Sequence, residues 1–205
     1  GGTLVTTTAA ELNLLDGDTS VGSSITVADA DGFVVNDGGT MKTIPATDIT
    51  TYVGGGITHA SWWHLTTSFT DSVDPITSNL SESIAMGSSM TESSGIFTFP
   101  STGFWRIHLH IGFSRGDTDA AYCSGVIRWS DDDGSSWQNR AMGTNFQLHA
   151  SVSNQATLDT IVDVTDVSND KVSFSTDVAH SSVITRGASA WPKHTYMTFI
   201  RLGDT

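Results

Sequence analysis

The feature that most constrains the fold is a long stretch in which apolar and polar side chains alternate. From Trp105 to Phe113 every second residue is apolar, and Arg106, His108 and His110 lie between them. Successive side chains of a β-strand point to opposite faces of a sheet, so this period of two predicts a strand with one face in a core. Shorter stretches of the same kind occur at residues 63–69, 96–99, 146–152, 158–164, 172–178 and 196–202. Together they predict an all-β fold, an antiparallel sandwich or jelly roll of about eight to ten strands.

The first 57 residues differ in composition and are expected to form a separate segment. They contain seven acidic residues but a single basic one, Lys42, and their aromatic residues are Phe33 and Tyr52 alone. Such a sequence has too little apolar surface to close a core of its own. We therefore expect residues 1–57 to form an extended stem that packs between identical copies, with residues 58–205 as the folded head. Disorder of the stem is the alternative.

Local signals within the stem predict short helices and a small hairpin. The segment from Thr8 to Glu11 has the spacing of a capping box, which predicts a short helix that ends at Gly17. Residues 33–44 surround the turn sequence Asn-Asp-Gly-Gly and predict a hairpin. Pro45 can open a second short helix, after which a run of three glycines would link the stem to the head.

The charge balance and the apolar pattern exclude several classes of partner. The formal net charge is −13, with 22 acidic against 9 basic residues, so the chain as a whole repels nucleic acid and anionic lipid. The sequence has no run of about 18 apolar residues, so no membrane span is expected. The single cysteine, Cys123, alternates with small and apolar residues, which indicates a buried and unreactive thiol.

One motif predicts a stapled hairpin. Ser130 to Trp137 reads SDDDGSSW, in which Asp132 can accept backbone hydrogen bonds, Gly134 can supply a positive φ and Trp137 can pack under the returning strand. The motif, with Ser130 at its start, resembles the Asp-box hairpins of sialidase propeller blades. In those blades the motif is not catalytic, so the resemblance implies a structural role and no glycosidase activity.

No arrangement of residues in the sequence predicts catalysis. A nucleophile elbow, an HExxH motif and a phosphate-binding loop are all missing from the sequence. Asp117 and Asp119 could form a carboxylate pair, but they lie in a turn among small residues, where solvated loop charge is the competing interpretation. We therefore expect a protein that is not an enzyme and has no required cofactor.

Exposed aromatic residues are the better indication of a binding site. The alternation places Trp62 and Tyr122 away from the core, and Trp191 lies in a predicted loop. Aromatic plates next to polar side chains such as Asp117 and Asp119 suit sugar recognition. Packing of these aromatic residues between subunits is the competing interpretation.

Two histidines on one strand are a candidate metal site. His108 and His110 lie on the same face of the predicted strand, about 7 Å apart. Imidazole is a common ligand of transition metals, so several such strands around a trimer axis could hold an ion. A polar sheet face with hydrogen-bonded histidines is the alternative.

Two local resemblances add an expectation about the kind of protein. The string TAAELNLLDG at Thr8–Gly17 is similar to a segment of the stems of bacteriophage tail fibres, and DGGTMK at Asp37–Lys42 resembles another piece of such stems. The region from about residue 61 to residue 204 resembles the trimeric jelly-roll family of complement-component and tumour-necrosis-factor-like domains. Its landmarks are GIFTF at 95–99, GFWRIHL at 103–109 and TFIRL at 198–202. Phe104 and Trp105 depart from the family pattern, which usually has a single Tyr there.

The resemblances imply a homotrimer whose last strand runs at the trimer centre. They also imply a virion fibre or spike protein, assembled in the host cytoplasm, whose stem contacts other virion proteins. Its head would bind a glycan or receptor on the bacterial surface. The alternative is a capsid head fibre or decoration protein without a receptor-binding role, and a secreted jelly-roll signalling domain is a third possibility.

Overall fold

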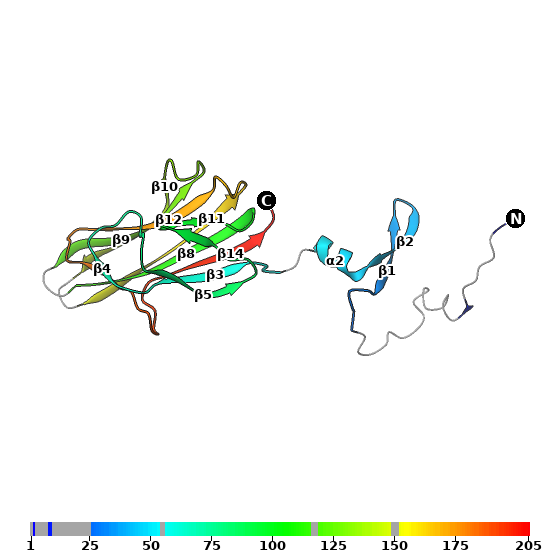
Figure 1. The fold of residues 1–205 in the computed structure, drawn as a ribbon, viewed down its shortest axis with the longest axis horizontal. Helices are drawn as coiled ribbons and strands as arrows, with labels where there is room; N and C mark the ends of the chain where they lie inside the picture. Colours follow the sequence, from blue (N-terminus) through cyan, green and yellow to red (C-terminus); the bar gives the residue numbers. More distant parts are fainter. Residues whose placement is uncertain (1, 3–7, 10–25, 54–55, 116–118, 149–151) are drawn as a thin grey trace. The chain divides into compact units, whose positions relative to one another are not determined.

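The computed structural model describes residues 2, 8–9, 26–53, 56–115, 119–148 and 152–205. The chain divides into two compact units, Gly1–Gly55 and Gly56–Thr205 (Figure 1). None of the helices in this described part has the length and hydrophobicity that a bilayer crossing requires.

The described residues of the first unit form the predicted hairpin and helix α2 (Ala46–Val53). Strands β1 (Gly32–Asp37) and β2 (Thr40–Pro45) pair antiparallel around the turn at Gly38 and Gly39. Both glycines have positive φ, as the two-residue turns of hairpins require. Helix α2 follows directly after Pro45, which confirms the second predicted helix. The other predicted helix, at residues 8–17, lies almost wholly outside the described residues.

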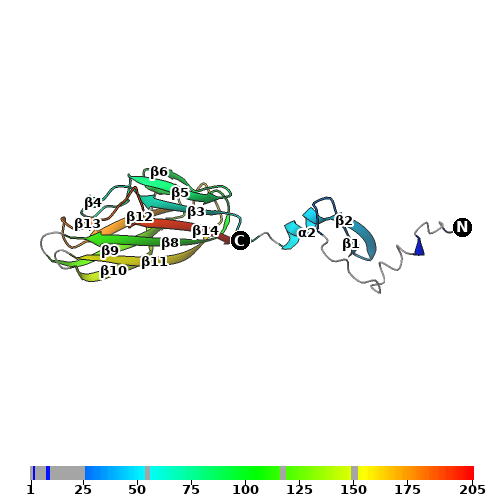
Figure 2. The same ribbon diagram turned by 90° about the horizontal axis from the view of Figure 1, so that it is seen from below.

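The second unit is an antiparallel sandwich of two sheets, which confirms the predicted fold (Figure 2). The five-stranded sheet has the order β10 (Gln138–Leu148), β9 (Ala120–Ser130), β12 (Lys171–Val178), β7 (Ile96–Thr98) and β6 (Thr91–Ser93). The seven-stranded sheet has the order β4 (Phe69–Thr70), β13 (Ile184–Thr185), β8 (Gly103–Ser114), β14 (Tyr196–Gly203), β3 (Ala60–Leu65) and β5 (Leu80–Met86). Its remaining strand, β11 (Ser153–Val164), pairs with β8 along twelve residues.

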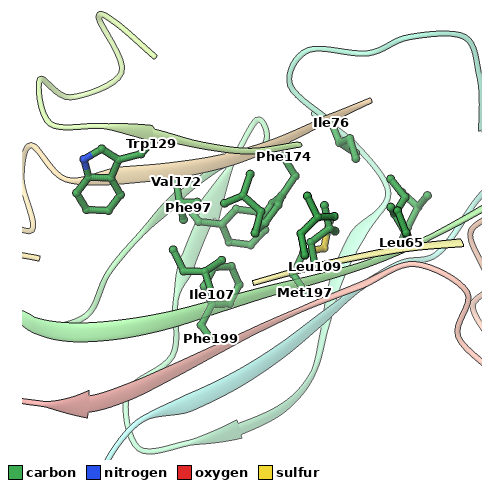
Figure 3. Packing of buried hydrophobic residues seen from close by; sticks show 14 of the residues in the cluster. Leu65, Ile76, Phe97, Ile107, Leu109, Trp129, Val172, Phe174, Met197 and Phe199 are labelled. Atoms are coloured by element: carbon green, nitrogen blue, oxygen red, sulfur yellow. The ribbon is translucent and has the colours of Figure 1, made fainter. Parts of the chain in front are cut away.

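Large apolar side chains from both sheets meet between the layers. The alternating residues of β8 are buried as predicted, from Trp105 through to Phe113. Phe97 lies at the centre, with its ring centroid 5.5 Å from Phe174 of the same sheet and 5.1 Å from Phe199 of the other (Figure 3). Burial of such rings is the main source of stability in a sandwich of this size.

The same alternation gives the seven-stranded sheet an outward face with an ordered set of side chains. In the register of β8 and β14, His110 lies opposite Tyr196, and His108 lies opposite Thr198. On the next strand, Trp62 of β3 lies opposite Thr198. This outward face therefore carries His108, His110, Tyr196 and Trp62 on neighbouring strands.

Candidate functional site

A row of stacked rings crosses the outward face of the seven-stranded sheet. Trp191 stacks on Trp62, with centroids 5.0 Å apart and planes at 16°. The ring of Trp62 lies 5.5 Å from Tyr196, which in turn stacks on His110 at 4.8 Å. We call these four residues the aromatic row. Its outer end, Trp191, remains 71 % exposed.

A buried histidine supports the loop that carries Trp191. His64 is 4 % exposed, and its Nε2 lies 2.7 Å from the Lys193 Nζ. Because an ammonium group can only donate, Nε2 must accept, which leaves the ring proton on Nδ1 to donate to the Ser83 Oγ at 2.8 Å. Burial and the positive charge of Lys193 lower the pKa of His64. The histidine is therefore held in its neutral form.

An apolar groove lies on the same face, toward the start of β8 and the end of β14. Its volume is about 210 Å³, and its lining residues are Ala60, Ser61, Trp62, Ile84, Met86, Thr198 and Ile200. Ile84 lies on the edge strand β5 and is 60 % exposed. We call this region the apolar groove.

The two histidines proposed as metal ligands do lie on one face, but each already has a partner. His108 Nδ1 is 3.2 Å from Asp159 Oδ2, and Asp159 also accepts two hydrogen bonds of 2.7 Å from Arg106. His110 Nδ1 is 3.2 Å from the Thr157 Oγ1. Among the residues that the structure describes, no group of three His, Cys, Asp or Glu could hold a metal ion. Metal binding at His108 and His110 would need ligands from other copies and stays a prediction.

A cavity of about 390 Å³ lies beyond His110, at the end of the sheet opposite the apolar groove. Its lining includes Gly112 and four basic side chains, those of His110, Arg186, Lys193 and His194. Three polar residues at the start of β11 complete it, namely Ser153, Asn154 and Gln155. Arg186 Nη2 lies 3.0 Å from His194 Nε2 and Nη1 lies 3.4 Å from the Ser153 Oγ. We call this region the basic cavity. Among the described residues, none that lines it is acidic.

The SDDDGSSW segment forms a tightly bonded turn between β9 and β10. Asp132 accepts hydrogen bonds from the Ser130 hydroxyl at 2.7 Å and from the Ser136 hydroxyl at 2.7 Å and N–H at 2.8 Å. These bonds, above all that from the Ser136 hydroxyl and then that from the Ser130 hydroxyl, lower the pKa of Asp132 to about 2. Gly134 has a φ of 83° and lies against Trp137. The carboxylate of Asp132 is thus used within the turn, whereas Asp133 contacts the next loop through its N–H to the Asn169 carbonyl at 2.9 Å and its carboxylate to the Lys171 Nζ at 3.3 Å.

Other predicted site residues do not join the aromatic row. Tyr122 lies on β9 in the other sheet, where its hydroxyl donates to Asp177 Oδ1 at 3.2 Å and where this bond raises the pKa of Tyr122. Asp119 is exposed directly before β9, and Asp117 lies outside the described residues. Among the predicted sugar-binding residues that the structure describes, Trp62 and Trp191 alone are brought together.

Several residues of this face were missed by the sequence analysis. Tyr196 could have been found, because the alternation of the last strand places its side chain on the face of the sheet away from the buried Met197 and Phe199. Arg186, Lys193 and His194 also gave a signal, since they form a local positive cluster in a strongly acidic chain. His64 gave none, because its partners come from β5 and from a loop distant in sequence.

Comparisons with known proteins agree on the fold. No protein-family model matches the sequence, and no curated protein matches it. Among solved structures, Eiger TNF from S. frugiperda superposes with a TM-score of 0.58 and 11 % identity, covering 74 % of this chain and 96 % of that one. Murine APRIL at pH 5.0 superposes with a TM-score of 0.53 and 10 % identity, covering 70 % and 98 % of the two chains. At such low identity the likeness shows the fold alone, a jelly roll of the tumour-necrosis-factor type.

Proposed function

We propose that the chain is a homotrimeric, non-catalytic binding protein whose jelly-roll head recognises a glycan on a cell surface. The observation that carries the proposal is the exposed ring of Trp191, which is held in place by stacking on Trp62. An aromatic face that is fixed before binding offers a sugar ring a large apolar contact at little cost in conformational entropy.

The Ser83–His64 pair on this face resembles a catalytic dyad, but its surroundings oppose catalysis there. Ser83 and His64 are within hydrogen-bond distance, as a nucleophile and its base would be. In a catalytic triad, a carboxylate orients the histidine and stabilises its protonated form. Here the second nitrogen faces Lys193, a cation that lowers the pKa of the ring and opposes proton uptake. His64 is therefore a poor general base.

The apolar groove supports the trimeric part of the proposal. Apolar residues of this size on the outward face of a sheet are costly to leave in water, and a second copy of the chain would cover them. The jelly-roll family that the sequence resembles forms trimers. Three heads on one particle would also turn weak single contacts into firm attachment.

The sequence of the first unit supports placing the protein in a virion fibre. The string DGGTMK, which resembles part of phage fibre stems, forms the turn and first half of β2 in the β1–β2 hairpin. The string at residues 8–17 lies outside the described residues, apart from Thr8 and Ala9. We expect an antibody against residues 56–205 to label the tail of intact phage particles in immunogold microscopy. Label spread over the capsid would instead support a head fibre or decoration protein, and unlabelled particles would refute a virion role.

Glycan binding is tested by removing the exposed indole. We expect Trp191→Ala to weaken binding of the full chain to bacterial surface polysaccharides on a glycan array by about thirtyfold, because truncating an aromatic anchor costs about 2 kcal/mol. Phe146→Ala is the matched control, since Phe146 is 74 % exposed but lies in the five-stranded sheet. Equal binding by the wild type and Trp191→Ala, or equal losses in both variants, would refute the assignment of Trp191 as the sugar platform.

A further inference from the structure

We propose that the basic cavity binds the oxyanion of an acidic saccharide, a carboxylate or sulfate group on a sugar whose ring lies on Trp191, the exposed outer end of the aromatic row. This inference rests on the proposed function, because it names the class of glycan that the head would recognise. It places the specificity of the site in Arg186, supported by Lys193 and His194.

The ion pairs of the protein leave the cations of the basic cavity without an acidic partner in the described residues. Most basic side chains of this acidic protein are paired with an aspartate, namely Lys42, Arg106, Arg128, Lys171 and Arg201. Arg186 and Lys193 have no carboxylate partner among the residues that the structure describes, although acidic residues outnumber basic ones by 22 to 9. Two cations at one cavity without a counter-charge create a local positive potential that attracts anions.

Within the described residues, most N–H donors of the Arg186 guanidinium are free to bind a ligand. The contacts of the Arg186 guanidinium are those to His194 Nε2 and the Ser153 Oγ. A guanidinium carries five N–H groups, so the others have no acceptor in the described part of the protein. A planar carboxylate or a sulfate can accept two parallel hydrogen bonds from such a fork. Arg186 is therefore prepared to bind an oxyanion.

The titration of the neighbouring histidines agrees with this interpretation. Burial and the charge of Arg186 lower the pKa of His194. Burial lowers the pKa of His110, with further contributions from His108 and His194. The cavity thus disfavours additional positive charge in the absence of an anion.

The basic cavity adjoins the aromatic row. His110 both lines the basic cavity and ends the aromatic row that begins at the exposed Trp191. Lys193 also lines the cavity, and its Nζ lies 5.9 Å from the Trp191 ring centroid. The cavity volume of about 390 Å³ falls within the usual range for small-ligand sites. A sugar ring on Trp191 and an acid group in the cavity can therefore belong to one saccharide.

The test compares matched oligosaccharides on the full chain by isothermal titration calorimetry. The probes are a galacturonate tetramer, a sulfated galactose tetramer and the uncharged galactose tetramer. We expect at least one acidic tetramer to bind about tenfold more tightly than the uncharged one, because a hydrogen bond to a charged group contributes about that factor. Arg186→Gln should abolish this preference, whereas Arg140→Gln, which removes an exposed arginine on β10, should keep it.

Each further outcome discriminates between the two proposals. If Trp191→Ala weakens all three tetramers but Arg186→Gln leaves their ranking unchanged, the proposed function stands and the oxyanion site is refuted. Equal binding of the charged and uncharged tetramers also refutes the oxyanion site. If inorganic sulfate binds as tightly as the sulfated tetramer, the cavity takes a free anion and the saccharide is refuted. If no tetramer binds and sulfate leaves the imidazole NMR signals of His194 unchanged, the inference is overturned.

Discussion

At the scale of single residues, the most informative side chain is the buried His64. It accepts a hydrogen bond from Lys193 and donates one to Ser83, so both ring nitrogens are used only when the ring is neutral. Protonation would place a second positive charge against an ammonium group that has no carboxylate partner in the described residues. The folded state therefore disfavours protonation of His64, and the free energy of unfolding must depend on pH.

The sign of this dependence follows from the lowered pKa of His64. The unfolded chain takes up the proton near the ordinary value of 6.5, whereas the folded chain takes it up only at lower pH. The stabilisation is complete above pH 6.5 and is lost as the pH falls through the lower, folded pKa. We expect the urea midpoint to decrease as the pH is lowered from 7 to 5. In His64→Gln this decrease should be smaller.

Two features sharpen that experiment. His110 and His194 also have lowered pKa values, so His64→Gln should remove only part of the slope. His180→Gln is the control for the loss of an imidazole, because His180 is exposed in a turn. A slope that stays unchanged in His64→Gln would show that the Lys193 contact does not determine the pH dependence.

At the scale of secondary structure, alternation predicted the strands whose two faces differ. In β8, one face meets the core and the other carries Arg106, His108 and His110, so the period of two is visible in the sequence. The two-residue strands β4 and β13 show no period at all. The alternation at 146–152 suggested a single strand, but β10 ends at Leu148 and β11 begins at Ser153. Alternation records which side a residue faces and contains no information on where the chain reverses.

The candidate site was less predictable than the sheets for a related reason. Trp62 could be placed on an outward face from its own neighbours, because a strand determines its side-chain directions locally. The basic cavity needs the pairing of β8 with both β11 and β13, which places His110, Ser153 and Arg186 around one cavity. Such pairing depends on register between distant segments, and a single sequence does not reveal it.

Close packing of the two sheets depends on a glycine in the middle of β9. A Cβ atom at Gly125 would lie 2.7 Å from Ile111 Cγ2 and 3.4 Å from side-chain atoms of Leu109 and Leu158. These residues are buried, and a β-branched isoleucine has little freedom to move aside. We expect Gly125→Ala to destabilise the fold by about 1 to 3 kcal/mol, the usual cost of overpacking. Urea denaturation measures this cost.

The matched control for this change is Gly203→Ala near the end of β14. No atom lies within 4 Å of a Cβ built at Gly203, so the added methyl group meets open space. Its urea midpoint should stay close to that of the wild type. Equal midpoints for Gly125→Ala and the wild type would mean that the sheets separate easily at this point.

At the scale of the whole molecule, the outward face of the seven-stranded sheet has two ends with different chemistry. The apolar groove, with Ile84, Met86 and Ile200, suits permanent contact with another copy. The basic cavity, with Arg186 and His194, suits a charged ligand that binds and leaves. Trp62 belongs both to the groove and to the aromatic row, so assembly and ligand binding would share a side chain. This overlap makes it necessary to test assembly by a residue outside the aromatic row.

Ile84 is suited to that test, because it lines the groove and is not part of the aromatic row. We expect the wild type to have three times the chain mass of 21.7 kDa in size-exclusion chromatography with light scattering. Ile84→Lys should have the mass of one chain, because an unpaired charge buried in an interface costs several kcal/mol. The control Met142→Lys adds the same charge at a residue that is 52 % exposed in the five-stranded sheet, and it should remain a trimer.

A wild type with the mass of one chain would refute trimerisation. An Ile84→Lys trimer would place the interface elsewhere, and loss of the trimer only in Met142→Lys would assign it to the five-stranded sheet.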